Sequence, residues 1–228
     1  NNFIDYIIIE IYVANHSWGH NIALWKPKKN RNSKWRWFLA DLDRGFEYHK
    51  IDRNYIEFVS GSDKIPGDNP YWTTIFLDKL FKNEQFRGLF TSKLSDYLYI
   101  TLHINSVKKD IRSFKAKIEN EISNHINRWK GSKSSYGNGL PTKEFWNNEI
   151  KHMLTFAEKR GDYIRKHLID KLKLKEAVNL NISITAKDAG KVSINDLIVP
   201  EDKWNGLYLQ DVPVTFTAIA NRGYKFLY

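Results

Sequence analysis

The feature that most constrains this sequence is an apolar run near its start that leads directly into a polar segment. Residues 3–13 read FIDYIIIEIYV and are apolar almost all round, apart from Asp5 and Glu10. Periodicity alone fits a strand or a helix, but the length of the run and its two acids favour a buried helix. The polar segment 15–21, NHSWGHN, follows at once. Polar side chains are therefore expected at the end of a rigid apolar element, where catalytic groups are often found.

A predicted β-hairpin and two acids come next. Two short runs of β-branched and aromatic residues, 22–25 and 35–40, flank a basic segment, which predicts an antiparallel pair. Asp41 and Asp43 directly follow the second run. Residues 47–70 are polar and contain Gly and Pro, and we interpret them as a connection without regular structure.

The middle of the chain has helical periodicity. Apolar residues recur at helical spacing from residue 71 onward. We expect helices near 72–81 and 86–98, a long helix from an N-cap at Ser106 to about 126, a loop over 130–141, and two closing helices within 142–172 that separate near Gly161.

In the last part of the chain, apolar residues alternate with other residues at a period of two. Strands are expected over 178–184, 192–194 and 212–218, with Gly and Asn between them. We therefore predict an α+β fold, mainly helical, with one domain over 1–175 and a small all-β module over 176–228. The sequence starts without Met just before an apolar run and stops within a strand-like pattern. We interpret it as a fragment whose β module is truncated and whose targeting signal lies elsewhere.

Composition restricts the classes of function. The formal net charge is +10, which fits either an anionic partner or a solvated basic surface. Lys residues are scattered along the chain, so we favour the solvated surface and rank nucleic acid as the least favoured partner. The absence of Cys excludes disulfides and thiolate metal sites. No apolar run reaches the roughly 18 residues that a membrane span needs. The oligomeric state is left open.

A series of short motifs, each weak alone, gives a resemblance when taken in order. The motifs are Asn15-His16-Ser17-Trp18 with Asn21, Lys34-Trp35-Arg36-Trp37, Asp41-Leu42-Asp43 with Gly45-Phe46, Asn69-Pro70-Tyr71-Trp72, Asn83-Glu84-Gln85-Phe86-Arg87 and Arg128-Trp129. In this order they resemble the CotH kinase family, named after a spore-coat protein. The tail, with 192–195, 204–208, 213–218 and 223–226, resembles β-repeat modules of bacterial surface proteins.

The resemblance implies an atypical protein-kinase-like fold, of which this chain is the larger lobe, with the phosphate-covering lobe upstream. It also implies Mg²⁺ and ATP as cofactors in the full-length parent, and a protein substrate or surface partner. The location implied is extracytoplasmic, on the cell surface or in the spore coat. Phosphoryl transfer needs amide and carboxylate oxygens that hold Mg²⁺ against the phosphates. Asn21 and Asp41 are the candidates for the nucleotide and metal site, and Asp43 is a candidate second carboxylate for the metal. These residues have a simpler interpretation too, since the acids can cap a turn before Gly45 and Asn21 can fix its own loop.

The catalytic position departs from the family pattern. Family members usually carry Asp before the Trp, where this chain has Ser17. Protein kinases place the base five positions before the metal-binding Asn, and five before Asn21 is His16. A neutral His can accept a proton, whereas Ser can only position one. We therefore name His16 and Ser17 as the candidates for the catalytic position.

Three functions remain open on the sequence. The first is a kinase that transfers the γ-phosphoryl group of ATP to Ser or Thr of a surface or coat protein. The second is a catalytically degenerate member that serves as a surface or coat binding or adhesion module. The third is a nucleic-acid-binding protein.

Overall fold

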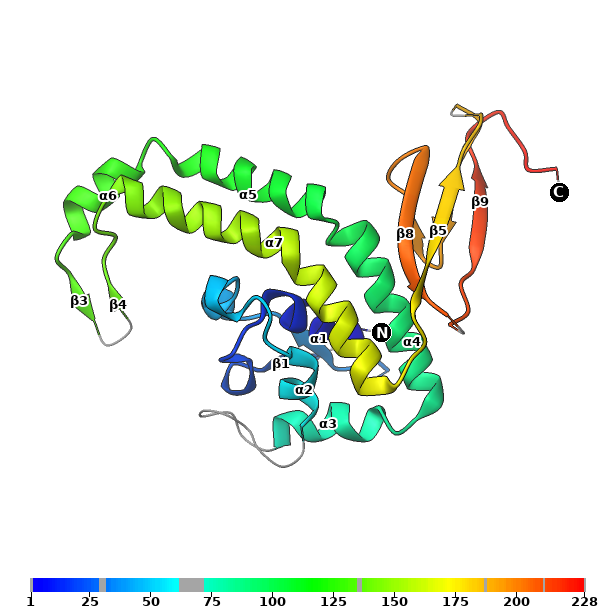
Figure 1. The fold of residues 1–228 in the computed structure, drawn as a ribbon, viewed down its shortest axis with the longest axis horizontal. Helices are drawn as coiled ribbons and strands as arrows, with labels where there is room; N and C mark the ends of the chain where they lie inside the picture. The colour runs from blue at the N-terminus through cyan, green and yellow to red at the C-terminus, as the bar shows by residue number, and fades with distance from the viewer. Residues whose placement is uncertain are drawn as a thin grey trace.

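The computed structural model describes residues 2–28, 32–61, 72–134, 137–186, 188–210 and 212–227. These form a mainly helical α+β fold, as predicted, and Figure 1 shows a helical body with a small β module at one side. Among the described residues, no helix combines the length and hydropathy that crossing a membrane requires.

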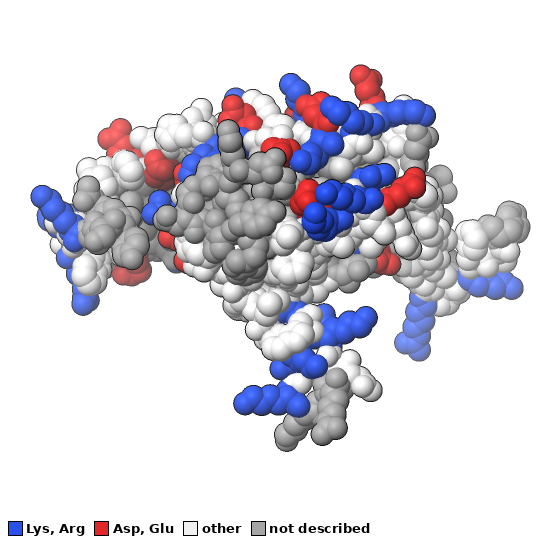
Figure 2. Space-filling model, turned by 90° about the horizontal axis from the view of Figure 1, so that it is seen from below, with Lys and Arg blue, Asp and Glu red and all other residues white. Residues whose placement is uncertain are grey.

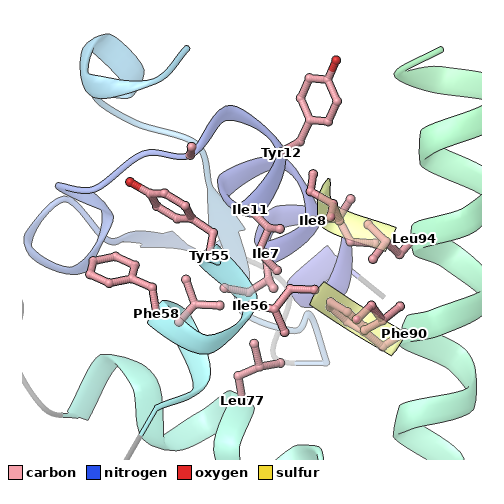
Figure 3. Packing of buried hydrophobic residues seen from close by; sticks show 14 of the residues in the cluster. Ile7, Ile8, Ile11, Tyr12, Tyr55, Ile56, Phe58, Leu77, Phe90 and Leu94 are labelled. Carbon is pink, nitrogen blue, oxygen red and sulfur yellow. The ribbon is translucent and has the colours of Figure 1, made fainter. Parts of the chain in front are cut away.

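Helix α1 (Asn2–Val13) is the centre of the body and confirms the helix predicted from the apolar run. A helix that is apolar on nearly every side is stable only when it is surrounded. Its neighbours come from α2 (Tyr55–Ser60), α3 (Trp72–Leu80), α4 (Glu84–Asp96) and α7 (Lys143–Leu172). Figure 3 shows Ile7, Ile8 and Ile11 packed among side chains from the neighbouring segments. They share one buried cluster with Ile56, Leu77, Phe90, Leu94 and Phe156.

The predicted β-hairpin is present and lies against α1. Strand β1 (Ala23–Trp25) pairs antiparallel with β2 (Arg36–Phe38), and Leu24 lies opposite Trp37. The Trp37 ring stacks on Tyr6, with centroids 5.3 Å apart, and its backbone amide donates to Asn2 Oδ1 at 2.5 Å. This packing fixes the direction in which β2 leaves the helix and delivers the segment that follows it.

Four of the expected segments differ in the structure. The connection over 47–70 contains a 3₁₀ turn, η3 (Tyr48–Lys50), and α2, while its residues 62–70 lie outside the described part. The long third helix is two, α5 (Ile104–Ile118) and α6 (Ile122–Trp129), and its N-cap is His103 rather than Ser106. The closing pair is the single helix α7, which runs through Gly161. Two short strands, β3 (Lys133–Ser134) and β4 (Gly137–Asn138), lie within the segment expected to be a loop.

Two of these differences have a local cause. Thr142 caps α7 by accepting a hydrogen bond from the Phe145 amide, and Phe156, Ile164 and Leu168 bury the helix on both sides of the glycine. This burial offsets the roughly 1 kcal/mol that a glycine costs inside a helix. The bend after α5 turns Ile122 and Ile126 onto Trp146.

The β module contains two antiparallel sheets. Strand β5 (Ala177–Ser183) pairs with β8 (Lys203–Leu209), and β6 (Gly190–Ile194) lies between β7 (Leu197–Ile198) and β9 (Phe216–Ala220). Strands β7 and β8 were not expected, and β9 begins at Phe216 rather than at residue 212.

Buried polar contacts join this module to the body. Asp96 at the end of α4 is 3% exposed and accepts hydrogen bonds from the Tyr208 hydroxyl at 2.7 Å and from Asn195 Nδ2 at 2.8 Å. Burial raises the pKa of the Asp96 carboxyl, while the two hydrogen bonds lower it. Trp204 Nε1 donates to the carbonyl of Tyr99 at 3.1 Å. The division of the chain at residue 175 stays a prediction, and β8 packs directly on α4.

Candidate functional site

The C-terminal end of α1 is held by a buried arginine from α7. The Arg160 side chain is fully buried and donates to the carbonyls of Ile11 and Tyr12 in the last turn of α1, at 2.7 and 3.2 Å. It also donates to the carbonyls of Ile51 and Arg53, each at 2.9 Å. Burial lowers the pKa of Arg160 to about 10, so the guanidinium stays charged at neutral pH. A cation at a helix C-terminus is favourable, and this one fixes the point from which the polar segment starts.

Asn15 connects the polar segment to the acids. Its side chain is fully buried, and its Nδ2 donates to Glu10 Oε2 at 3.0 Å and to the Asp41 carbonyl at 3.4 Å. Its Oδ1 accepts from the backbone amide and the hydroxyl of Ser17, at 3.3 and 3.0 Å. One amide thus links the helix, the segment that follows it and the segment after β2.

Asn21 and Asp41 lie together, as the hairpin predicted. Asn21 Nδ2 donates to Asp41 Oδ2 at 2.8 Å, although the two residues are 20 positions apart. Both lie at the open end of the β1–β2 ribbon, where Ala23 pairs with Phe38. The Asp41 side chain makes no cap hydrogen bond to the 3₁₀ turn η2 (Leu42–Arg44) that it precedes. The proposed turn-capping role of Asp41 is therefore wrong for its carboxylate, which is exposed and faces Asn21.

The backbone around Asp41 is strained and fixed in place. Asp41 has φ 53° and ψ 57°, a left-handed conformation that Asp tolerates better than most residues. The Phe46 amide donates to the Val13 carbonyl at 2.7 Å. A Cβ at Gly45 would lie 3.1 Å from Val13 Cβ, so a larger residue would have to push the strand-to-turn segment away from the end of α1 by a few tenths of an ångström. Strain that the surrounding structure maintains is common at functional sites.

His16 and Ser17 face different partners. His16 Nδ1 lies 3.1 Å from Glu47 Oε1 and 2.8 Å from Lys50 Nζ, and Lys50 and Glu47 form an ion pair at 2.5 Å. Burial and the Lys50 charge lower the pKa of His16, so the imidazole is neutral at neutral pH. The Ser17 hydroxyl, by contrast, is turned toward Asn15. Asp43 is exposed on η2, and its carboxylate makes no hydrogen bond or ion pair within the described part of the chain.

The described residues do not form a metal site made of protein ligands alone. No group of three or more His, Asp or Glu side chains gathers around a common point among the described residues. Mg²⁺ bound with a nucleotide needs only one or two protein oxygens, because phosphates and water complete its shell. Asp41 and Asn21 place an exposed carboxylate beside a side-chain amide whose Nδ2 faces it.

Comparison with known proteins finds a family model that matches most of the chain. The family model described as CotH kinase protein matches residues 1–164. The chain belongs to the CotH kinase family. The match includes the candidate residues of the site and ends inside α7, so the β module lies beyond it. No curated protein and no solved structure matches the chain. The CotH match supports a kinase-like domain, while the place of this chain in the larger lobe and the likeness of its tail to surface repeats stay predictions.

Figure 2 shows the distribution of charge on one face of this CotH chain. On the face that Figure 2 shows, Lys and Arg are spread over several parts of the surface, with Asp and Glu among many of them. No single basic patch covers the described part of this face.

The buried Glu10 under the site predicts a pH dependence of stability. Burial raises the pKa of Glu10 to about 7 from an ordinary value of 4.5, although the Asn15 hydrogen bond opposes this shift. The folded chain therefore binds more protons than the unfolded chain between these values, and stability falls as pH rises through this window. We expect a loss of about 3 kcal/mol from Glu10 between pH 4.5 and 7.

Urea unfolding of the wild type and of Glu10→Gln across this range measures the effect. The slope attributed to Glu10 should vanish in the variant, while Glu149→Gln, an exposed acid on α7, should keep it. Equal slopes in the wild type and Glu10→Gln would contradict the assignment.

Proposed function

We propose that this chain is a kinase domain that transfers the γ-phosphoryl group of ATP to a Ser or Thr hydroxyl of a protein. The observation that carries the proposal is the Asn21–Asp41 contact at 2.8 Å in a chain of the CotH kinase family. An acceptor on the cell surface or in a spore coat, and an extracytoplasmic location, follow from the family resemblance and are part of the proposal.

Asn21 and Asp41 are the residues that would hold Mg²⁺. Bound there, Mg²⁺ would supply positive charge that offsets the negative charge developing on the phosphates during transfer. The Asn21 amide now donates its Nδ2 to Asp41. The amide would have to rotate about its Cβ–Cγ bond, so that Oδ1 rather than Nδ2 lies beside the carboxylate. Asp43 is proposed to add a second carboxylate or to orient the first.

His16 is the residue we assign to the proton of the acceptor hydroxyl. The hydroxyl oxygen bonds to the γ-phosphorus, the bond from that phosphorus to the bridging oxygen breaks, and ADP leaves. The hydroxyl proton passes to Nε2 of the neutral imidazole, in the tautomer whose Nδ1–H donates to Glu47 Oε1. Ser17, anchored to Asn15, positions the acceptor but cannot take the proton.

Phosphate incorporation tests this function. The full-length parent protein is incubated with Mg²⁺, γ-labelled ATP and an unstructured acceptor protein rich in Ser and Thr, and labelled phosphoserine and phosphothreonine are identified after acid hydrolysis. We expect incorporation by the wild type and a loss of about 10²–10⁴-fold in His16→Ala. The matched control is His49→Ala on η3, an exposed histidine that should leave the rate unchanged.

Two results would reject the proposal. Equal rates of incorporation in His16→Ala and the wild type would show that His16 is not the base. Nucleotide binding without any incorporation would instead assign the degenerate role, in which the domain binds a surface or coat partner and transfers nothing.

A further inference from the structure

A helical arm projects from the body on the side away from the β module. It consists of α5, α6 and the first half of α7, and Figure 1 shows it extending beyond the other helices. Its end has a small buried cluster of its own, formed by Ile122, Ile126 and Trp146. The residues assigned to phosphoryl transfer lie outside the arm, so the role of the arm is separate from the proposed function.

The apolar stripe of α5 runs on past its covered part. The stripe recurs at spacings of four, three and four residues, which is one face of a helix, and consists of Val107, Ile111, Phe114 and Ile118. Val107 packs against the main core and Ile111 is buried. Phe114, by contrast, is 64% exposed and Ile118 is 49% exposed. The outer half of the stripe therefore offers apolar surface that the described part of the chain leaves largely open.

Two more large aromatic side chains are exposed at the end of the arm. Trp129 in the last turn of α6 and Phe145 in the first turn of α7 are each 46% exposed. A single exposed apolar residue is ordinary, whereas several on one projecting element are typical of an interaction surface.

The arm also carries most of the net charge of the chain. Residues 104–143 contain nine Lys or Arg and three Asp or Glu, a net charge of +6, while the other 188 residues together carry +4. Lys109, Arg112 and Lys117 are exposed on α5. A second copy of the chain would bring the same excess of positive charge to this surface. The charge therefore opposes self-association through the arm and favours an anionic partner.

Cations lie over two of the exposed rings. Lys117 Nζ is 5.0 Å from the centre of the Phe114 ring, and Arg128 Cζ is 5.0 Å from the centre of a Trp129 ring. Each pair presents an aromatic ring and a positive charge at the same point of the surface. At the boundary of an anionic bilayer, apolar side chains enter the layer between headgroups and acyl chains, while Lys and Arg meet the phosphates.

We propose that the arm binds the surface of an anionic phospholipid bilayer, with Phe114 and Ile118 in the headgroup layer and the exposed cations of α5 on the lipid phosphates. The contact is peripheral, because single side chains enter the bilayer and the helix lies along it. Each basic residue near such a surface raises the affinity about fivefold, so three of them account for about 100-fold.

Sedimentation of the whole chain with lipid vesicles tests the proposal. The anionic vesicles contain equal parts of phosphatidylcholine and phosphatidylglycerol, and vesicles of phosphatidylcholine alone are the uncharged comparison. We expect binding to the anionic vesicles that weakens as salt is added, and binding to the uncharged vesicles that is at least about tenfold weaker.

Two triple variants with the same net charge separate the arm from the rest of the chain. The first removes three exposed cations of α5, namely Lys109→Gln, Arg112→Gln and Lys117→Gln. It should weaken binding to the anionic vesicles by about 100-fold. The control removes three exposed cations outside the arm, namely Lys82→Gln, Lys191→Gln and Lys225→Gln. It should stay within about twofold of the wild type, because distant charges are screened.

The apolar part of the contact has its own readout. Phe114→Gln combined with Ile118→Gln keeps every charge and changes only exposed side chains, so the variant should fold and bind about tenfold or more weakly. Because the chain has no Cys, Ile118→Cys can carry a single environment-sensitive fluorophore. Its emission should shift to the blue on anionic vesicles, while the same label at Lys82→Cys should not respond.

Several results would overturn the lipid contact. These are absence of binding to the anionic vesicles, equal weakening by the two triple variants, or a label at Ile118→Cys that does not respond on bound protein. Poly-glutamate and single-stranded DNA are tested in parallel. Binding of either one in place of the vesicles would assign the arm to an acidic protein or to a nucleic acid, and would reject the bilayer.

Discussion

Arg160→Met should lower the free energy of unfolding by about 3–5 kcal/mol. Methionine keeps most of the volume but removes the donor for the carbonyls of Ile11, Tyr12, Ile51 and Arg53. Each carbonyl left buried without a partner costs about 1–3 kcal/mol, and water can relieve only part of this in a site that is fully buried. Urea denaturation followed by circular dichroism measures the loss.

The matched control is Arg112→Met on the neighbouring α5. Arg112 is exposed, so this substitution should change stability by no more than about 0.5 kcal/mol. A loss below about 1 kcal/mol in Arg160→Met would show that the end of α1 does not depend on this side chain.

Asp41→Ala should reduce phosphate incorporation by at least about 100-fold. The carboxylate is the one anionic group that faces Asn21 in the described structure, and removal of a preorganised charge from a transfer site commonly costs 10²–10³ in rate. Alanine tolerates the left-handed backbone of residue 41 less well than Asp, so a second variant is needed to separate charge from strain.

Asp41→Asn makes that separation. Asparagine keeps the size and tolerates the same backbone, yet lacks the charge, so it should fold like the wild type and still lose most of the rate. Asp170→Ala, an exposed acid on α7, should leave the rate unchanged. Full activity in Asp41→Asn would show that the Asp41 carboxylate does not bind the metal ion.

The parts of the fold that local patterns determine could be predicted from the sequence. The apolar run specifies α1 because a helix without a polar face must be buried. The hairpin brings Asn21 and Asp41 together because antiparallel pairing of Ala23 with Phe38 requires it. The extent of α7 could not be predicted, since the break expected at Gly161 is overridden by packing on both sides of it.

The residues that hold the candidate site in place could not be predicted from the sequence, for a different reason. Arg160 lies 149 positions from its acceptor Ile11, and no local pattern distinguishes it from the other basic residues of α7. Glu47 and Lys50, which orient His16, lie in a segment that was interpreted as an irregular connection.

Metal binding in the presence of ATP tests the central claim most directly. Electron paramagnetic resonance of Mn²⁺, a substitute for Mg²⁺, gives the affinity for the wild type, Asn21→Ala, Asp41→Ala and the double variant. If both side chains hold one ion, each single change should weaken Mn²⁺ by about tenfold or more, and the double change should cost less than the two combined. Unchanged affinity in both single variants, or losses that simply add, would show that Asn21 and Asp41 do not share a cation.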